Sequence, residues 1–261
     1  MKLMTKPAQM QKAVSRWKKS GDTVALVPTM GALHAGHVAL IRHAAKLADR
    51  VVVSVYVNPT QFNSRSDFLA YPKRLRDDRK ASAQSGADVL FRPPTLYARD
   101  ASTWVEEQEQ SRGRCGARRP GHFRGVATVV VKLLSIVQPD WMLLGEKDGQ
   151  QCAVLERVVR DLFYPVRIVR HPTVRENDGL PLSSRNQRLN SAERVAAGRM
   201  ARAVQIAAGK RARVAVPHLH QLLRGIKGVR LEYAEIVDGV LWVAAWVGKV
   251  RLIDHRRCRG R

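Results

Sequence analysis

The sequence predicts an α/β fold, namely a doubly wound, Rossmann-like parallel sheet followed by a smaller α+β domain. Valine-rich apolar runs alternate with amphipathic segments through the first two-thirds of the chain, as in βαβ units whose sheet is covered on both faces. The last ninety or so residues change pattern, because Asp238-Gly239 between two apolar runs is typical of a tight antiparallel hairpin. We therefore expect two domains, residues 1–172 and residues 173–261.

The elements of the first domain are expected in strict alternation after an N-terminal helix. That helix places Met10, Val14 and Trp17 at helical spacing, although its basic, acid-free composition is also found in transit peptides. The second domain begins with a helix over 191–209 and continues with the hairpin. Strands of the first domain are expected over 23–29, 50–57, 87–93, 139–144 and 164–172, and helices over 37–50, 71–86, 125–137 and 149–162.

Charge is the unusual quantity of the composition. The 46 basic and 22 acidic residues leave a net charge of +24, which favours anionic partners without identifying them. Cys115, Cys152 and Cys258 are far apart and form no CxxC pair, so the chain fits a reducing, cytoplasmic setting. No apolar stretch reaches the roughly 18 residues of a membrane helix.

The segment "VPTMGALHAGH" (27–37) joins a strand to a helix and carries two glycines and two histidines. The N-terminal end of a helix attracts anions through unpaired N–H groups and the helix dipole. Three interpretations of His34 and His37 remain open: a zinc pair, for which further ligands are missing, structural histidines, or contacts to phosphate.

Polar segments follow two other strands in the same way. "NPTQF" (58–62) follows the strand ending at Val57, and "GEKDGQQ" (145–151) follows the strand ending at Leu144. Ligands of doubly wound sheets bind at the carboxyl ends of strands where the strand order reverses. If the first and fourth predicted strands flank that point, His34, His37 and Lys147 should converge there.

Two further segments supply cations and hydroxyls. Ser183, Ser184 and Arg185 form either a phosphate-binding set or a helix cap with a solvated arginine. The loop 111–125 carries five arginines, most of which we expect at the surface. Motifs of serine hydrolases and zinc proteases are absent, and the set of cations and amide donors suits reactions at a phosphate centre.

Seven blocks together resemble the pantothenate synthetase (pantoate–β-alanine ligase) family: "VPTMGALHAGH", "VNPTQF", "YPKRLRDD", "RPGHFRGVATVVVKLLSIVQPD", "GEKDGQQ", "DGLPLSSRNQRL" and "VAAWVGKVRLID". The family belongs to a nucleotidyltransferase superfamily with an HxGH loop, which here is His34-Ala35-Gly36-His37. The resemblance implies a ligase of pantothenate biosynthesis, on the route to coenzyme A. Pantoate would be activated with Mg·ATP as pantoyl adenylate and then transferred to β-alanine. A cytoplasmic homodimer is also implied.

The resemblance also implies roles for individual residues. His34, His37 and Lys147 would be catalytic, with His37 matching the family's proton donor. Asp77 and Asp78 match a Mg²⁺ site proposed in some relatives. ATP would be bound by Met30, Gly31, Ala32, Leu33, His34, Ala35, Gly36, His37, Gly145, Glu146, Lys147, Asp148, Val174, Leu182, Ser183, Ser184 and Arg185, and pantoate or β-alanine by Gln61, Gln151, Asn58 and Arg119.

Two other functions are compatible with the residues. One is an enzyme of the same superfamily that activates another acid. The other is a nucleic-acid-binding protein on a nucleotidyltransferase scaffold, which the net charge of +24 would suit. We expect neither a specific nucleic acid nor a membrane as partner, because the sequence has no recognition motif and only 6% aromatic residues.

Overall fold

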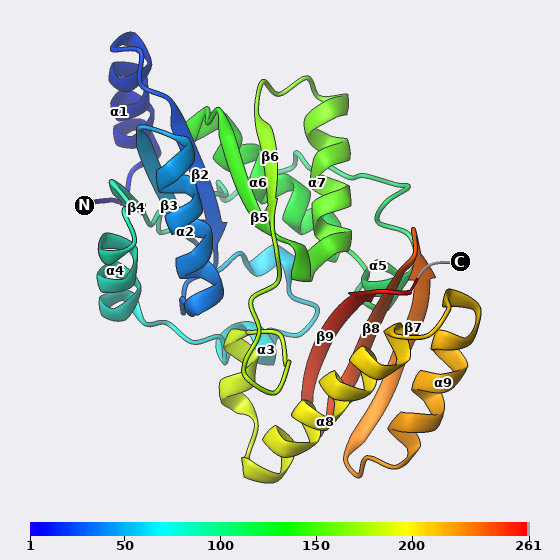
Figure 1. Ribbon diagram of the computed structural model, residues 1–261. Coiled ribbons are helices and arrows are strands. Elements are labelled where there is room, and N and C mark those ends of the chain that lie inside the picture. The colour runs from blue at the N-terminus through cyan, green and yellow to red at the C-terminus, as the bar shows by residue number, and fades with distance from the viewer. Residues whose placement is uncertain (260–261) are drawn as a thin grey trace. The chain divides into compact units, whose positions relative to one another are not determined.

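The computed structural model describes residues 1–259 of the chain, so the last two residues of the second predicted domain lie outside the described residues. The chain divides into two compact units, Met1–Pro172 and Thr173–Arg261. Figure 1 shows the strands of the first unit in blue to green and those of the second in orange to red. Among the described residues, no helix is long and apolar enough to cross a membrane.

The described part of the first unit contains a six-stranded sheet in the order β1-β4-β3-β2-β5-β6, with every pairing parallel. The chain runs outward from β2 through β3 to β4 and then returns to place β5 beside β2, so the strand order reverses between these two strands. This confirms the predicted fold class and the predicted switch point. The strands are β1 (Lys2–Met4), β2 (Val24–Thr29), β3 (Arg50–Val55), β4 (Val89–Phe91), β5 (Trp141–Gly145) and β6 (Arg167–His171).

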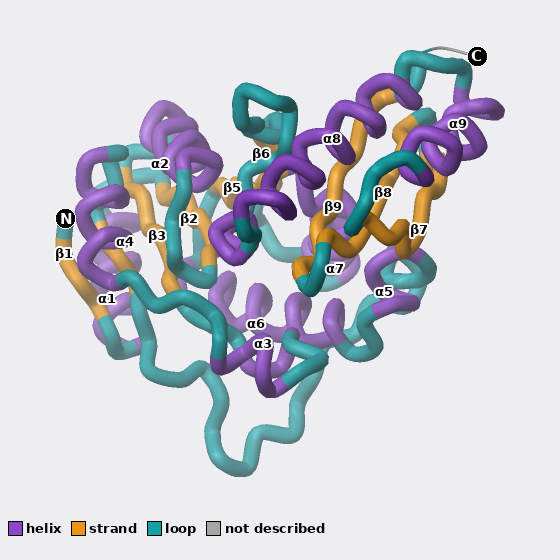
Figure 2. Tube along the Cα trace, turned by 90° about the horizontal axis from the view of Figure 1, so that it is seen from below, coloured by secondary structure: helices purple, strands orange, loops and turns teal. Residues whose placement is uncertain are grey.

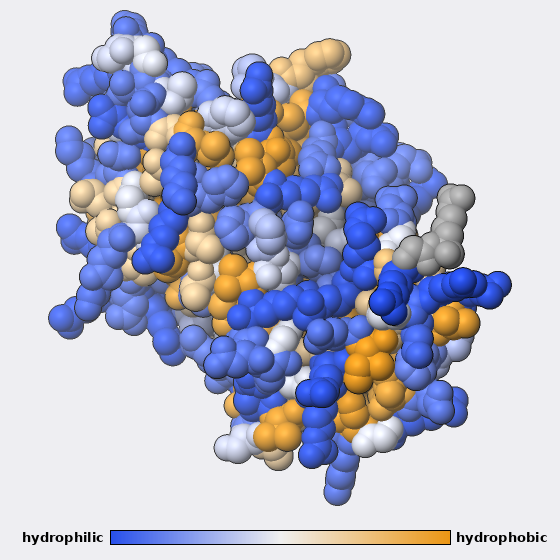
Figure 3. Space-filling view, in the orientation of Figure 1, coloured by the Kyte–Doolittle hydropathy of each residue, from blue (hydrophilic) through white to orange (hydrophobic). Residues whose placement is uncertain are grey.

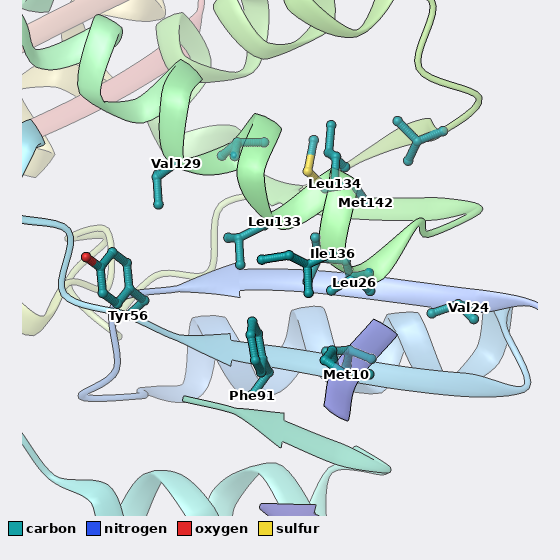
Figure 4. Close-up of a cluster of buried hydrophobic side chains, with 14 of the residues drawn as sticks. Met10, Val24, Leu26, Tyr56, Phe91, Val129, Leu133, Leu134, Ile136 and Met142 are labelled. Atoms are coloured by element: carbon teal, nitrogen blue, oxygen red, sulfur yellow. The ribbon is translucent and has the colours of Figure 1, made fainter. Parts of the chain in front are cut away.

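Helices cover both faces of this sheet. One face packs against α1, α6 and α7 and the other against α2 and α4, and Figure 4 shows Met10, Leu133 and Leu134 packed on the first face beside β2. Burying a leucine or valine side chain contributes about 1.5–3 kcal/mol, which explains why valine-rich α6 is helical once twelve of its residues are buried. The helices are α1 (Pro7–Lys19), α2 (Ala35–Leu47), α3 (Arg65–Leu69), α4 (Leu75–Gln84), α5 (Arg114–Arg118), α6 (His122–Val137) and α7 (Gly149–Asp161), with 3-10 turns η1 (Pro59–Gln61) and η2 (Glu146–Asp148).

The second unit is a three-stranded antiparallel sheet, within the described residues, with α8 and α9 on one face (Figure 2). Asp238 and Gly239 have φ angles of 52° and 73°, as a type I′ turn requires, and they join β7 to β8 as predicted. The buried face of α8 is mostly alanine, which lets the helix lie close to the sheet. The elements are η3 (Ser184–Arg188), α8 (Ser191–Ala208), α9 (Ala212–Arg224), β7 (Val229–Val237), β8 (Val240–Val247) and β9 (Val250–Arg257).

Several elements were not predicted, among them the five-residue helices α3 and α5, which are too short for a periodic pattern. Strand β1 has only three residues, too few for a periodic pattern. Helix α9 carries Pro217 in its interior, and a proline there argues against a helix because it removes one backbone hydrogen bond. The third strand of the second sheet, β9, follows a turn at Gly248 that was not distinguished from the apolar run around it.

Candidate functional site

The turn between β2 and α2 wraps around a buried carboxylate. Asp78 is 2% exposed, and its two oxygens accept hydrogen bonds from the backbone N–H groups of Ala32 (3.0 Å) and Leu33 (2.7 Å). Burial raises the pKa of Asp78, while these N–H bonds act in the opposite direction. Gly31 has a φ of 83°, and a Cβ there would lie 2.9 Å from Asp78 Oδ2, so glycine allows the backbone to approach the carboxylate. The turn is thereby held rigidly.

The two histidines cap the start of α2. His34 is the N-cap residue, and its Nδ1 accepts a hydrogen bond from Gly36 N at 3.2 Å. His37 reaches back, with its Nδ1 accepting from His34 N at 3.3 Å, and the ring centroids lie 4.1 Å apart. Because each Nδ1 is an acceptor, the proton of each neutral ring is on Nε2. Each ring therefore has one N–H that the cap does not use.

Both imidazoles are neutral at pH 7. Burial lowers the pKa of His34 to about 4, with a further lowering by the ammonium of Lys147. The pKa of His37 is lowered well below 6.5, first by burial and then by His34 and Lys147. Protonating either ring would place a second positive charge beside Lys147. Positive charge in this group therefore comes from the lysine, and the imidazoles contribute neutral N–H donors.

Lys147 lies on η2, directly after β5. Its side chain is 20% exposed, and Nζ lies 3.8 Å from Asp148 Oδ2. The pairing of β5 with β2 covers Ala25 and Leu26, and the end of β2 extends past it towards the glycine turn. The parallel pairing of β2 with β5 places the histidine turn and the lysine turn at the same edge of the sheet. Lys147 lowers the pKa of both imidazoles, so the three residues predicted to converge lie close together.

The end of β3 contributes an amide pair beside this group. Gln61 Nε2 donates to the sulfur of Met30 at 3.1 Å, and its Oε1 accepts from Asn58 Nδ2 at 3.0 Å. Asn58 is 1% exposed and also bonds Gly125 O, Thr60 Oγ1 and Tyr97 OH. Both amide hydrogens and the oxygen of Asn58 are used within the protein. Asn58 therefore orients Gln61, whereas sequence analysis grouped both as ligand contacts.

The start of α6 fixes the backbone of the same turn. Gln61 O accepts hydrogen bonds from His122 Nδ1 (2.8 Å) and Arg119 Nη2 (3.2 Å). His122 donates from Nδ1, so its Nε2 accepts from Arg119 Nη1 at 2.9 Å. A Cβ on Gly125 would lie 2.5 Å from Thr60 O, so glycine lets α6 approach η1 closely. Arg119 is thus joined to Gln61, as a shared site requires.

The remaining predicted residues of the first unit lie where β5 passes into η2 and in the first turn of α7. Gly145 ends β5 and its carbonyl accepts from Cys152 Sγ, and Glu146 begins η2. Gln151 is half-buried in the first turn of α7. These residues frame the lysine turn.

The predicted residues of the second unit lie together on one irregular segment. The backbone of Leu182 donates to Val174 O at 3.0 Å. Ser183 caps η3, with its Oγ accepting from Arg185 N at 3.2 Å, and Ser184 and Arg185 lie in the first turn of η3. Ser183 is thus a cap, as the structural interpretation of this segment expected, while Arg185 is half-buried. The ATP contacts of this segment stay a prediction.

Asp77 and Asp78 do not form a metal site by themselves. Adjacent residues of a helix point about 100° apart, and here Asp77 is exposed while Asp78 is buried. Both oxygens of Asp78 already accept backbone N–H bonds. Among residues 1–259, no group of three His, Cys, Asp or Glu side chains could hold a metal ion. The donor set does not fit a protein-bound Mg²⁺ at this position.

Sequence reasoning missed the residues that support the site. Asp78 binds the turn between β2 and α2, His122 binds the carbonyl of Gln61, and the side-chain amide of Gln150 accepts from Cys115 N. Each of these contacts joins segments that are distant in sequence. No local spacing predicts such pairs. One available signal was the block containing His122, which was used only to identify a family.

Taken together, the first unit presents two neutral imidazole donors, an ammonium and the Gln61 amide at the carboxyl ends of three neighbouring strands. These groups suit a reaction in which a substrate attacks a phosphate. The protein then needs no nucleophile of its own and supplies position and charge. The face of the protein seen in Figure 3 is rich in hydrophilic residues, and the net charge of +24 also favours anionic substrates.

Comparison with known proteins gives one consistent answer. A family model described as "Pantoate-beta-alanine ligase" matches residues 2–257. The chain is 42% identical over 269 residues to the pantothenate synthetase of Pseudomonas savastanoi pv. phaseolicola and 43% identical over 269 residues to that of Shewanella amazonensis, and 95% of each chain is covered in both cases.

Solved structures agree with this. The crystal structure of pantothenate synthetase from Thermus thermophilus matches with a TM-score of 0.91 and 38% identity, covering 98% of this chain and 99% of that one. A pantoate-beta-alanine ligase from Francisella tularensis, crystallised with "Beta-gamma ATP and Beta-alanine", matches with a TM-score of 0.89 and 35% identity, covering 98% and 97%. These matches therefore cover both units of the chain.

Proposed function

The chain belongs to the pantoate-beta-alanine ligase family, and on that premise we propose that it joins pantoate to β-alanine in an ATP-dependent reaction. The pantoate carboxylate attacks the α-phosphorus of ATP, forming pantoyl adenylate and releasing pyrophosphate. The β-alanine amine then attacks the acyl carbon, forming the amide bond of pantothenate and releasing AMP.

One observation carries the mechanistic part of the proposal. His34 and His37 are neutral, half-buried and next to Lys147, so the group combines an ammonium with two N–H donors, and its carboxylate Asp148 is half-exposed and 3.8 Å away. Such a group favours an anionic ligand, and a triphosphate supplies that negative charge. Lys147 would offset charge on the phosphates, and the Nε2–H groups would donate to phosphate oxygens as charge moves during attack.

The neutral state of His37 refines its predicted role as proton donor. In the ligand-free chain its lowered pKa leaves it unprotonated at pH 7, so it can donate a hydrogen bond and not a full proton. A bound polyphosphate places negative charge beside the ring and favours the protonated form. His37 would therefore become a proton donor only after ATP binds.

Pantoate would lie against the amide group of the second strand end. Gln61 is held between Met30 and Asn58 and presents its amide at the edge next to the histidine turn. Gln151 would supply a second amide from α7, and Arg119 would attract the substrate carboxylate. Asn58 would act by orienting Gln61, because its own amide is already satisfied.

Several further features remain part of the proposal. Mg²⁺ would enter with ATP as its counter-ion, and no step here is assigned to a protein-bound metal. The family resemblance supports a cytoplasmic homodimer and ATP contacts from Val174 and from residues 182–185. These features rest on the resemblance alone.

The decisive experiment is an AMP-release assay with ATP, pantoate and β-alanine, each omitted in turn. We expect pyrophosphate from ATP and pantoate alone, and AMP with pantothenate only when β-alanine is added. Replacing pantoate by other hydroxy acids tests the alternative of another adenylating enzyme. Pyrophosphate release that is faster with another acid than with pantoate would overturn the proposal.

A further inference from the structure

Gln150 binds the backbone of a distant segment through its side-chain amide. It lies in the first turn of α7 and is 6% exposed. Its Oε1 accepts from Cys115 N at 2.9 Å, and its Nε2 donates to the carbonyl oxygens of Gln110 (3.0 Å), Arg112 (3.0 Å) and Gly113 (3.2 Å). One buried amide thus bonds four backbone groups of a segment some 35 to 40 residues earlier in the chain.

The segment that Gln150 holds has little regular structure of its own. Glu107 closes its first turn by accepting N–H bonds from Glu109, Gln110 and Ser111. Gly116 packs so tightly on the carbonyl of Ser111 that a Cβ would lie 1.7 Å from it. These contacts are internal to the segment, and Gln150 connects it to α7.

The segment leads directly to the arginine of the candidate site. It continues as α5 and ends at Arg119, whose guanidinium bonds Gln61 O and His122. At the other end of the connection, Gln150 is three residues after Lys147. Lys147 and Arg119 therefore belong to two segments that one buried amide joins.

We propose that Gln150 is a positioning residue that holds the arginine-bearing segment 110–119 against the turn carrying Lys147, and so fixes Arg119 for its substrate. The part of this inference that concerns catalysis rests on the proposed function, whereas the mechanical part does not. Removing the amide donors frees three carbonyls and lets the segment detach while the sheet stays folded. Gln150 itself touches no reacting atom.

The test compares Gln150→Glu with Gln108→Glu. The first variant keeps the size of the side chain and an acceptor for Cys115 N, but it loses both N–H donors and places a carboxylate against three carbonyls. The second makes the same chemical change at an exposed position two residues before this segment. Trypsin reports the state of the segment, because Arg112, Arg114 and Arg118 are cleavage sites when it opens.

We expect tryptic cleavage within 112–119 to be about tenfold faster or more in Gln150→Glu, since cleavage follows the open population. Gln108→Glu should match the unsubstituted chain. In the AMP assay, kcat/KM for pantoate should fall about tenfold or more, with the KM for ATP nearly unchanged. Gln150→Asn keeps the amide on a shorter side chain. Its cleavage rate and its kcat/KM for pantoate should therefore lie between those of Gln150→Glu and those of the unsubstituted chain.

Four outcomes separate the possibilities. Equal cleavage of the two glutamate variants would overturn the inference, as would cleavage spread along the whole chain, because Gln150 would then support the fold generally. Faster local cleavage with an unchanged kcat/KM would refute the positioning role. If the unsubstituted chain releases no AMP with pantoate while local cleavage still increases in Gln150→Glu, the proposed function fails and the mechanical part of the inference stands.

Discussion

Each unit of the molecule contains a group of titratable side chains that are buried or half-buried, and the two groups differ in how their hydrogen-bond donors are used. In the first unit His34 and His37 lie beside Lys147, and burial lowers the pKa of both imidazoles. In the second unit Arg175 lies beside Asp254, and burial raises the pKa of Asp254 to about 6. Both groups have shifted pKa values, which are often taken to mark functional sites.

The arginine of the second group makes its hydrogen bonds within the protein. Arg175 Nη1 donates to Asp254 Oδ1 at 2.8 Å and to Gly179 O at 2.9 Å, and Nη2 donates to His255 O at 2.8 Å. The cation and the carboxylate join the beginning of the unit to β9. This arrangement holds a segment in place, and Arg256 lies beside the pair as a second guanidinium, where burial and Arg175 lower its pKa.

The group in the first unit contains an ammonium and two neutral N–H donors. Its ion pair is looser, because Asp148 Oδ2 is 3.8 Å from Lys147 Nζ and the Asp148 side chain is 45% exposed. The capping contacts leave the Nε2–H groups of His34 and His37 unused, so these groups can donate to an anion, whereas the guanidinium of Arg175 is bonded within the protein. A shifted pKa alone does not identify a ligand site, and N–H donors that the fold does not use at the ends of adjacent strands are the more specific signal.

The largest expected effect is on stability and comes from Arg175→Met. It leaves Asp254 buried without its arginine partner, which typically costs about 3–5 kcal/mol. The folded pKa of Asp254, about 6, lies above its unfolded value of 3.8, so stability already falls as pH rises between these values. The loss in the variant should therefore be greater at pH 7.5 than at pH 5.

Urea unfolding at the two pH values measures this difference. Arg202→Met, at an exposed position of α8, is the matched control and should change little. An equal loss at both pH values would show that Asp254 is not the group left uncompensated. AMP release by folded Arg175→Met should be retained, because the pair serves the fold.

Lys147→Ala should show the opposite pattern, with a large loss of activity and little change in stability. Removing one preorganised charged donor lowers kcat by about 10²–10³, and adenylate formation should fall more than the KM for ATP rises. Lys12→Ala, exposed on α1, controls for the loss of one positive charge. Single-turnover release of pyrophosphate measures the step, and an unchanged rate would remove Lys147 from the mechanism.

Much of the fold could be predicted from the sequence because its signals are local. The valine-rich strands, the amphipathic helices and the Asp238-Gly239 turn each depend on neighbouring residues, and the chain folds accordingly. Helix α9 was missed because Pro217 argues locally against a helix, whereas burial of Leu219 and Leu223 stabilises it. Tertiary burial therefore outweighed a local rule.

Of the candidate site, the sequence predicts the residues expected to contact the ligand, but not the residues that hold them in place. His34, His37 and Lys147 stand next to strand ends, and strand topology then brings them together. Asp78 and Gln150 were not predicted as supports because a carboxylate or amide that binds distant backbone has no characteristic spacing. Such contacts become visible only when the chain is folded.

A smaller effect on stability is expected from Asp78→Asn. Asparagine has one oxygen where aspartate has two, so one of the N–H groups of Ala32 and Leu33 would face an NH₂ group. Leaving such a buried donor unsatisfied costs about 1–3 kcal/mol. Urea unfolding measures the loss, and kcat should fall with displacement of the turn. Titration with Mg²⁺ should not restore activity; recovery at high Mg²⁺ would instead support a metal role for Asp78.

The smallest expected effect concerns the protonation of His34 and His37, which should not change above pH 6.5. The folded pKa of His34 is about 4, below its unfolded value of 6.5, so the unfolded chain binds more protons between these values and stability rises with pH across that window. Above pH 6.5 both imidazoles should stay neutral, with the proton on Nε2. Long-range ¹⁵N–¹H spectra of the ligand-free chain measure the tautomer directly, and the urea-unfolded chain serves as the control in which the rings titrate normally. A ring of His34 or His37 that titrates near pH 6.5 in the folded chain would mean that water solvates it, and the first group would then not present the two neutral N–H donors on which its contrast with the second group depends.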